Sequence, residues 1–336
     1  MQRADDRKTS GVGLSLAGDC SGGDFRNRDK VRIALIATHT PTRLTPAVPA
    51  WVADWVGAPA ATDRWDRREQ GVRFTGQAVY GRRFAHVQVR VHDAASLCDL
   101  KLQHATTQAY RRLRRALEDG AAAHPVRFWN FIPGIGDRAG DGMDRYMVFN
   151  AGRYAAFSDW FCATHRDQLA PRIATATGVG HAGSDLVVHV LGDRLAGKPV
   201  ENPRQTAAYR YSSAYGPLPP CFARATLIAG DSAAPRRLIV GGTASIVGET
   251  SRHIGDVPAQ TRETLDNLEA LLGAAGASGL IALHAVRVYH IDPADAPGML
   301  ADVRERLPHL SGDIEMVHAP LCRPNLDVEI EGLADL

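Results

Sequence analysis

The spacing of apolar residues is most regular toward the end of the chain. The segment 237–247, RLIVGGTASIV, is typical of a buried strand interrupted by a glycine pair, and 280–291 predicts a second strand. Between them, leucines at three- and four-residue spacing predict an amphipathic helix over 258–276 that ends near Gly273. A second helix is predicted over 293–307.

Two further strands, over 313–322 and 326–334, complete a unit in the order β-α-β-α-β-β. The first half of the chain carries a similar series of patterns, because VRFWNFIP at 126–133 parallels VRVYHIDP at 286–293. The other elements of this first unit are expected at 103–120, 144–161 and 184–192. The order of elements therefore predicts an internal repeat.

The repeat predicts an α+β fold of two tandem domains, each a mixed sheet with helices packed on one face. We expect a degenerate first domain over 31–192 and a second domain over 193–336, which begins with a linker segment and carries the candidate catalytic strand. Residues 1–30 are polar, rich in Gly, Ser and Asp, and lack the apolar run of a signal peptide. They predict a disordered N-terminal tail.

Composition narrows the class of protein without assigning a function. The chain has 336 residues, of which 45% are hydrophobic, and its net charge of +2 gives no bias toward nucleic acid or membrane partners. No window contains the apolar run that a bilayer span needs. The five cysteines are widely separated and form no CxxC pair, which predicts reduced thiols and a cytoplasmic location.

Two segments carry candidate chemistry. The stretch 201–217, ENPRQTAAYRYSSAYGP, combines two arginines with three tyrosines, which together can bind carboxylates and a ring. In LDVEIEGLA the alternation of a strand puts Asp327, Glu329 and Glu331 on one face. Two interpretations stay open: this acidic face is solvated, or one glutamate is buried, holds its proton at neutral pH and acts as a general acid.

Other catalytic patterns are missing from the sequence. The Gly-rich segments 134–142 and 178–185 match neither a P-loop nor a dinucleotide fingerprint, so both are predicted to be loops. The sequence contains no GxSxG elbow of a serine hydrolase and no HExxH metal motif. The arginines of 111–115 are typical of the solvated face of an amphipathic helix rather than of a nucleic-acid patch.

Six short segments share a pattern beyond their separate chemistry. They are GGTASIVG at 241–248, GD at 255–256, QTRETLDN at 260–267, NAGRYAAF at 150–157, LCRPNLDVEIEG at 321–332 and the stretch 201–217. Together they resemble the YjgF-like (RidA-like) fold in the form used by chorismatases, from about residue 126 to the end of the chain. The resemblance implies two tandem YjgF-like (chorismate-mutase-like) domains with a site near their junction.

The resemblance also implies an activity: cleavage of chorismate with release of pyruvate, using no metal and no organic cofactor. It assigns to Glu329 the protonation of the enolpyruvyl methylene carbon of chorismate. Cys322, seven residues before that acid, resembles the cysteine of family members that form 3-hydroxybenzoate, with some 4-hydroxybenzoate. The alternative product is 3,4-dihydroxycyclohexa-1,5-diene carboxylate, formed when water hydrolyses the ether.

The expected substrate-binding residues lie in segments that resemble the family. They are Arg153, Arg210, Tyr211, Tyr215, Arg224 and Thr243. Tyr209 and Tyr211 alternate with Arg210, so in a regular strand the two tyrosines would face the side opposite to that arginine. The Gly241-Gly242 pair is expected to shape the pocket by letting the backbone approach the ligand.

Two rival functions remain. A YjgF-like imine deaminase also uses an arginine for a substrate carboxylate, although such proteins usually have one domain. A non-catalytic binding protein for aromatic acids would keep the arginines and tyrosines but would not need a protonated Glu329. The expected partner is the small molecule chorismate rather than nucleic acid or membrane, and the sequence leaves open a monomer or a homo-oligomer such as a trimer.

Overall fold

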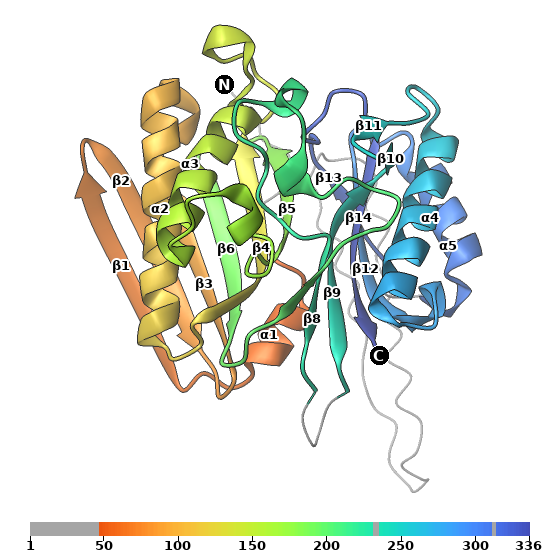
Figure 1. The fold of residues 1–336 in the computed structure, drawn as a ribbon, viewed down its shortest axis with the longest axis horizontal. Helices are drawn as coiled ribbons and strands as arrows, with labels where there is room; N and C mark the ends of the chain where they lie inside the picture. The colour runs from red at the N-terminus through yellow and green to blue at the C-terminus, as the bar shows by residue number, and fades with distance from the viewer. Residues whose placement is uncertain (1–46, 231–234, 311–313) are drawn as a thin grey trace, which may run out of the picture. The chain divides into compact units, whose positions relative to one another are not determined.

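The computed structural model describes residues 47–230, 235–310 and 314–336 (Figure 1). The segment 1–30, predicted to be a disordered tail, lies outside the described residues. None of the helices in the described ranges has both the length and the apolar character needed to cross a membrane. The described chain forms two six-stranded mixed sheets with helices, which confirms the predicted α+β class.

The first sheet has the spatial order β1-β2-β3-β6-β4-β5. Its β4 and β5 run parallel, and the other neighbouring strands run antiparallel. The helices α2 (Asp99–Asp119) and α3 (Arg145–Phe161) pack on one face of this sheet. The strands are β1 Ala61–Glu69, β2 Val72–Tyr80, β3 Phe84–Val91, β4 His124–Pro133, β5 Thr175–His181 and β6 Leu186–Asp193.

The second sheet has the spatial order β13-β12-β14-β9-β8-β7. Here β12 and β13 run parallel, and the other neighbours run antiparallel. The helices α4 (Val257–Ala275) and α5 (Ala296–Arg306) pack on one face. The strands are β7 Lys198–Val200, β8 Ala225–Ile228, β9 Arg237–Ala244, β12 Leu283–His290, β13 Ile314–His318 and β14 Val328–Asp335, and a small hairpin pairs β10 Ile246–Val247 with β11 Thr250–Ser251.

The two sheets have the same topology, which confirms the predicted repeat. Read from the β7 edge, the second sheet has the order β7-β8-β9-β14-β12-β13. Its strands therefore occupy the same positions, in the same chain order, as β1 to β6 in the first sheet. In each sheet the parallel pair is connected through a helix, α3 or α5. The motif at 126–133 therefore corresponds to the motif at 286–293, and the acidic strand β14 corresponds to β6.

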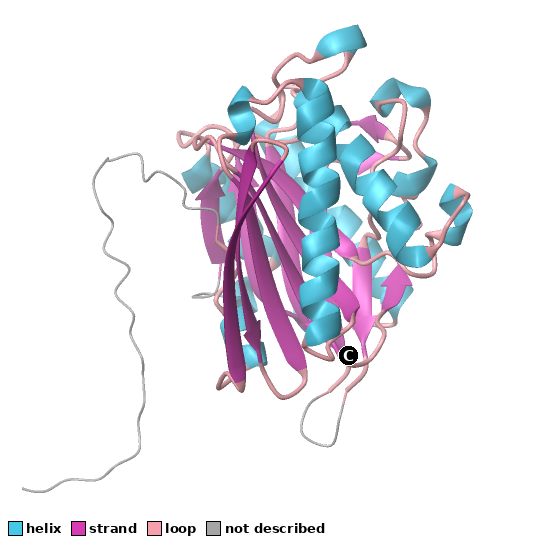
Figure 2. Ribbon diagram, turned by 90° about the vertical axis from the view of Figure 1, so that its left-hand side faces the viewer, coloured by secondary structure: helices cyan, strands magenta, loops and turns pink. Residues whose placement is uncertain are grey.

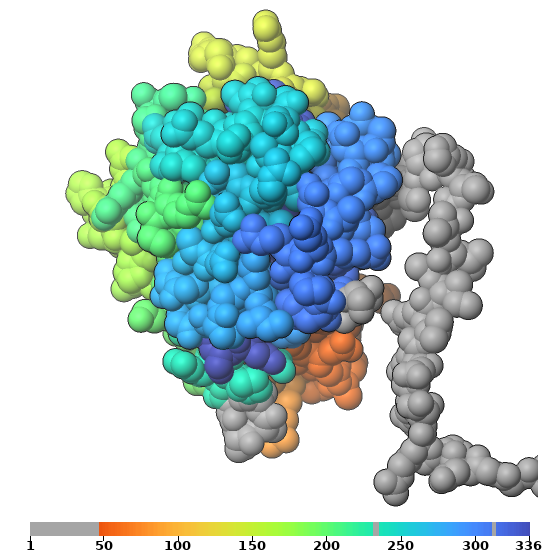
Figure 3. Space-filling model, turned by 90° about the vertical axis from the view of Figure 1, so that its right-hand side faces the viewer, coloured from red at the N-terminus to blue at the C-terminus, as the bar shows by residue number. Residues whose placement is uncertain are grey.

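Three apolar cores hold these layers together. The first lies between the first sheet and its helices and includes Leu113 of the long helix α2, which Figure 2 shows beside the strands. The second lies between the second sheet and its helices and includes Leu268 of α4; Figure 3 shows this outer, helical side of the molecule. The third lies between the two sheets, where Trp129 packs with residues of both sheets and of the short helix α1 (Trp51–Val56). The helices thus cover the outer faces, and the inner faces of the sheets share one core.

Local chemistry sets the ends of α4. The Asp256 carboxylate caps its start, because Oδ1 accepts a hydrogen bond from the Ala259 backbone N–H at 2.9 Å. The predicted end at Gly273 is wrong, since the helix continues to Ala275. Gly276, with φ of 83°, supplies the left-handed conformation that closes the helix.

The loop prediction for 178–185 is wrong in its first half. Residues 178–181 belong to β5, which pairs in parallel with β4. Gly178 is packed closely, because a Cβ atom there would lie 3.2 Å from the ring of Tyr146. The glycines hide the strand pattern in the sequence because a missing side chain carries no apolar signal.

Candidate active site

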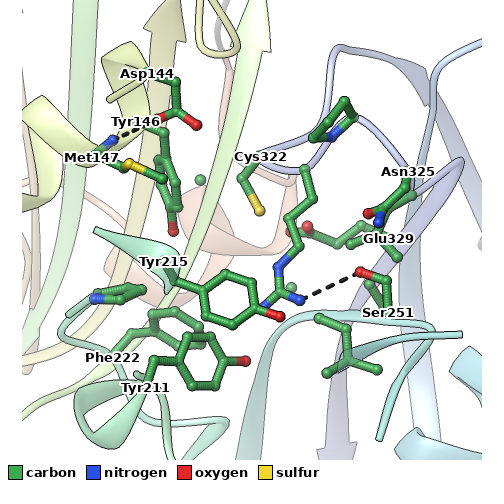
Figure 4. A pocket seen from close by; sticks show the side chains of 18 of the residues that line it. Asp144, Tyr146, Met147, Tyr211, Tyr215, Phe222, Ser251, Cys322, Asn325 and Glu329 are labelled. Atoms are coloured by element: carbon green, nitrogen blue, oxygen red, sulfur yellow. Dashed lines mark hydrogen bonds between the residues drawn. The ribbon is translucent and has the colours of Figure 1, made fainter. Parts of the chain in front are cut away.

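A cavity of about 310 Å³ lies where the two repeated units meet. Its wall combines residues of α3 and β5 from the first unit with residues of β9 and β14 from the second (Figure 4). The remaining wall comes from the segment 201–224 between β7 and β8, from the β10–β11 hairpin and its continuation to Ile254, and from the loop before β14. This volume suits a small ligand with a ring and a few substituents.

Glu329 is the acidic residue of β14 that reaches this cavity. In the sheet it lies opposite Tyr289 of β12 and Ala244 of β9, and only 5% of the residue is exposed. Burial, followed by the negative charge of Glu331, raises the pKa of its carboxyl from 4.5 to about 8. The solvated interpretation is therefore wrong for Glu329 and Glu331, and burial favours the protonated form of Glu329.

Gly242 of β9 packs directly against this carboxyl. A Cβ atom at position 242 would lie 1.8 Å from Oε1 of Glu329, so any side chain there would displace the acid. The backbone N–H of Gly242 donates to Oγ1 of Thr177 at 3.0 Å, which connects β9 to β5 of the other sheet. The sequence predicts that the glycine pair lets the backbone approach a ligand. In the structure the backbone at Gly242 instead lies against the side chain of Glu329.

Arg153 of α3 lines the cavity and is 1% exposed. Its Nη2 donates a hydrogen bond to Oδ1 of Asn150 at 2.8 Å, and its guanidinium carbon lies 5.3 Å from the ring centroid of Phe149. Its buried Nε has no hydrogen-bond partner among the described residues. The helix therefore presents a positive charge that is only partly satisfied by its own neighbours.

Arg224, directly before β8, builds a second wall with the rest of the segment 201–224 that connects β7 to β8. Its Nη2 donates to the Tyr211 hydroxyl at 2.6 Å and to the Thr206 carbonyl oxygen at 3.0 Å. The rings of Tyr211 and Tyr215 lie 5.1 Å apart, and the guanidinium of Arg323 lies 4.0 Å from the centroid of the Tyr215 ring. Two arginines and two tyrosines therefore support one another on this side of the cavity.

Three arginines give the wall of the cavity a positive charge. None of Arg153, Arg224 and Arg323 forms an ion pair with an acidic side chain of the described residues. The ionisable acid in the wall besides Glu329 is Asp144, which is engaged in capping α3 through the Met147 N–H at 2.8 Å. Because a buried charge without a counter-ion is unfavourable, the cavity suits a ligand with more than one negative charge.

Cys322 and Tyr146 face the cavity as neutral polar groups. Burial raises the pKa of the Cys322 thiol to about 12, and burial also raises the pKa of the Tyr146 hydroxyl above its usual value. The charge of Glu329 contributes to both shifts, so the three side chains lie close together. Figure 4 shows Cys322 between Tyr146 and Glu329 in that view.

The structure brings most of the predicted site residues to this one cavity. Its wall includes Glu329, Arg153, Arg224, Tyr211, Tyr215 and Cys322. Arg210 lies elsewhere: its side chain is 62% exposed and its Nε pairs with Oδ1 of Asp167 at 3.3 Å. Thr243 is fully buried and donates to the Gly241 carbonyl oxygen at 3.1 Å, on the face of β9 opposite to Gly242.

Among the wall residues that were not predicted from the sequence, Arg323 and Tyr146 carry side chains of chemical interest. Arg323 directly follows Cys322 in the segment that resembles the family, so the predicted role of Cys322 could have pointed to Arg323 as a site residue. Tyr146 lies seven residues before Arg153, a spacing that places both on one face of a helix. In the described ranges no group of three His, Cys, Asp or Glu side chains is placed to hold a metal ion.

The sequence is similar to proteins of one known family. A family model described as "Chorismatase FkbO/Hyg5-like, N-terminal" matches residues 63–192. The chain is 35% identical over 240 residues to a 3-hydroxybenzoate synthase from Streptomyces hygroscopicus, and the match covers 68% of each chain. It is 32% identical over 225 residues to a chorismatase from Streptomyces rapamycinicus, covering 64% of this chain and 65% of the relative.

The fold is also similar to solved structures. A crystal structure of a chorismatase matches with a TM-score of 0.67 and 26% identity, covering 80% of this chain and 78% of that one. A member of the YjgF/YER057c/UK114 family from Mycobacterium tuberculosis matches with a TM-score of 0.30 and 26% identity, covering 39% of this chain and 98% of that one. The first likeness is long enough to include strands of both sheets.

Proposed function

Because the chain belongs to the chorismatase family, we propose that it cleaves chorismate to pyruvate and a hydroxybenzoate, with 3-hydroxybenzoate as the main product. One observation carries the proposal: a buried Glu329, whose pKa is raised to about 8 by burial, shares a cavity with three arginines that lack ion-paired acidic partners among the described residues. Such a site combines a proton donor with the means to hold an anion.

Chorismate matches this combination in charge and shape. It has one carboxylate on its ring and a second on the enolpyruvyl ether, so it needs two separate cationic partners. Arg153 comes from the first unit, whereas Arg224 and Arg323 come from the second, which supplies positive charge from two parts of the wall. Tyr211 and Tyr215 add ring contact and hydroxyl groups.

In the proposed reaction Glu329 delivers its proton to the methylene carbon of the enolpyruvyl group. The transfer leaves an oxocarbenium ion on the ether and a carboxylate on Glu329. Arg127, Arg224 and Arg323 all favour the ionised form of Glu329 and so stabilise that carboxylate. Burial and the charge of Glu331 thus favour the protonated Glu329 before substrate binds, and the arginines stabilise its carboxylate after the transfer.

Two routes lead onward from the oxocarbenium ion, and they differ in their use of water. In the proposed route the neighbouring ring hydroxyl oxygen bonds to the ether-bearing ring carbon while the ether bond breaks, and the hydroxyl proton is lost, which restores the protonated form of Glu329 by the end of the turnover. The ether oxygen leaves as the ketone oxygen of pyruvate, and the epoxide-like intermediate rearranges to a hydroxybenzoate without net uptake of water. In the alternative, water adds to the oxocarbenium carbon and leaves the diene diol. Cys322 supports the first route, because a neutral thiol beside Glu329 leaves less room for an attacking water.

The test is to incubate the purified protein with chorismate in ¹⁸O-labelled water, reduce pyruvate to lactate at once, and resolve the aromatic products. We expect pyruvate and 3-hydroxybenzoate in equal amounts, with no label in the lactate hydroxyl. Substituting Cys322→Ala enlarges the cavity next to the acid, so we expect a larger fraction of labelled lactate and diol from that variant.

Other outcomes separate the alternatives. Labelled lactate with a non-aromatic diol from the wild-type protein would keep the cleavage of chorismate and overturn the proposed product. Release of no pyruvate at all would contradict the activity, and would favour an imine deaminase or a binding protein for aromatic acids.

A further inference from the structure

Glu331, the second glutamate of β14, lies behind the cavity in a buried cluster. Its Oε2 accepts hydrogen bonds from Nη2 of Arg127 and from Oγ1 of Thr177, both at 2.6 Å. Its Oε1 accepts one from Nε1 of Trp129 at 3.0 Å, and Nη1 of Arg287 lies 4.0 Å from the same oxygen. Glu331 is 3% exposed and does not line the cavity, so this cluster does not touch a ligand there.

The cluster is connected to Glu329 in two ways. The two glutamates are two residues apart on one strand, so their side chains leave the same face about 7 Å from each other. Thr177, which donates to Glu331, also accepts the backbone N–H of Gly242, and Gly242 packs against the Glu329 carboxyl. The Glu331 carboxylate therefore affects Glu329 in two ways: it places a negative charge behind Glu329, and through Thr177 it holds β9 beside it.

Charged and titratable groups face Glu329 from several elements. They are Glu331 of β14, Arg127 of β4, Arg224 before β8, Arg323 and Cys322 of the loop before β14, and Tyr146 of α3. Cys322 and Tyr146 are neutral, and the arginines favour the ionised form of Glu329. The negative charge of Glu331 opposes them, and its effect on the pKa of Glu329 is larger than that of any single arginine.

We propose that Glu331 is a positioning residue for the proton transfer: its buried carboxylate, held by Arg127, Thr177 and Trp129, keeps Glu329 protonated in the free enzyme and fixes Gly242 beside it. This inference rests on the proposed role of Glu329 as the acid. Without the negative charge of Glu331, Arg127 acts on Glu329 uncompensated. Glu329 then releases its proton at lower pH, before substrate binds.

The variant Glu331→Gln tests this through the pH profile of kcat/KM, whose alkaline limb reports the acid of the free enzyme. Loss of a like charge lowers the pKa of Glu329, so we expect the limb to move to lower pH by about one unit. The ratio of the variant's rate to the wild-type rate then falls by about tenfold between pH 6 and pH 9. A uniform loss of activity with an unmoved limb is what a merely structural role produces, and it would overturn the proposal.

Two matched variants show whether the charge itself is responsible. Glu331→Asp keeps the negative charge, so its alkaline limb stays near the wild-type position even if the rate falls. Glu315→Gln removes the other carboxylate that Arg287 binds, at 2.8 and 2.9 Å, but its side chain is 52% exposed at the edge strand β13. We expect the wild-type profile for this control, and a limb that moves as far as in Glu331→Gln would contradict the inference.

Glu331→Gln leaves Arg127 buried without its counter-ion, which can prevent folding. The double variant Glu331→Gln, Arg127→Gln removes both charges and avoids that problem. Glu331 affects the pKa of Glu329 more than Arg127 does. We therefore expect the alkaline limb of the double variant to move to lower pH, by less than in Glu331→Gln alone. An unmoved limb or a shift to higher pH would overturn the proposal.

The variant Glu329→Gln distinguishes failure of this inference from failure of the proposed function. If Glu329→Gln is inactive at every pH while Glu331→Gln keeps the wild-type limb, Glu329 remains the acid and only the role of Glu331 is overturned. If Glu329→Gln keeps wild-type activity, the acid assignment fails and the inference about Glu331 fails with it.

Discussion

At the scale of single residues, the partner of each arginine decides what that arginine can bind. Arg127 is paired with Glu331 in the interior, and Arg210 is paired with Asp167 on the surface. Arg224 instead holds a tyrosine hydroxyl and a carbonyl oxygen, neither of which cancels its charge. An anionic ligand can therefore gain more from Arg224 than from either of the paired arginines.

We predict that Arg224→Lys raises the KM for chorismate by about tenfold or more, because lysine lacks the planar fork that can hold a carboxylate and Tyr211 together. Arg210→Ala is the matched control, and its KM should stay within about twofold since its side chain is 62% exposed and outside the cavity wall. Steady-state kinetics at one pH measures both. Equal increases in KM for the two variants would contradict the placement of the binding site.

The residue types in the sequence predicted most of the charged and aromatic residues of the cavity wall. The predictions that failed depend on backbone geometry that the sequence pattern does not show. Arg210 is turned away from the cavity because the segment 208–210 forms a short 3-10 turn, whose direction strand alternation cannot predict. The burial of Glu329 was one of two open interpretations, since alternation alone does not tell a packed face from a solvated one. The cluster around Glu331 was not predicted, because it joins three strands that are far apart in the sequence.

At the scale of elements, the pairing of β9 with β14 shapes the site. Glu329 lies opposite Ala244, and the register of the two strands shifts between Ile330 and Gly332. The Glu329 carboxyl occupies the space that a side chain at position 242 would need. The absence of a side chain at this position therefore determines where the acid can sit.

We predict that Gly242→Ala lowers kcat by about tenfold or more while the protein still folds, because overpacking by one methyl group costs about 1–3 kcal/mol and here displaces the acid. Gly273→Ala is the control in α4, where a Cβ atom would meet nothing within 4 Å. It should leave kcat unchanged and stabilise the protein by about 0.5–1 kcal/mol. If Gly242→Ala keeps wild-type kcat, the Glu329 carboxyl does not act from this position.

Regular apolar spacing predicted the type of several elements after residue 100, whereas β1, β2 and β3 were not predicted. The spacing predicted α4, α5 and the paired motifs of β4 and β12, because buried leucine and valine positions follow the period of each element. It failed for β5, whose glycines carry no pattern, and for the end of α4, which depends on the conformation of Gly276. Glycine positions in β5 and at the end of α4 are thus where the apolar pattern gave wrong predictions.

At the scale of the whole described chain, the two repeated units share a core and a buried ion pair. Trp129 of the first sheet and Tyr289 of the second belong to the same apolar cluster. Nη2 of Arg127 and Oε2 of Glu331 join the sheets at 2.6 Å, with side chains that are 1% and 4% exposed. The division into domains 31–192 and 193–336 remains a prediction, but the units are expected to depend on each other for stability.

We predict a single unfolding transition for the protein, because separating the units would expose this shared core and leave buried charges unpaired. Urea unfolding followed by tryptophan fluorescence and by far-ultraviolet circular dichroism should give coincident curves. Two resolved transitions, or curves with different midpoints, would mean that the units fold independently.

The rate of pyruvate release from chorismate by the wild-type protein and by Glu329→Gln tests most directly whether Glu329 is the acid. The substitution keeps the shape of the side chain and removes its transferable proton. We predict a rate that falls by about a hundredfold or more, while Glu305→Gln, a change at an exposed position of α5, leaves the rate unchanged. A Glu329→Gln protein that releases pyruvate at close to the wild-type rate would contradict the role of Glu329 as the proton donor.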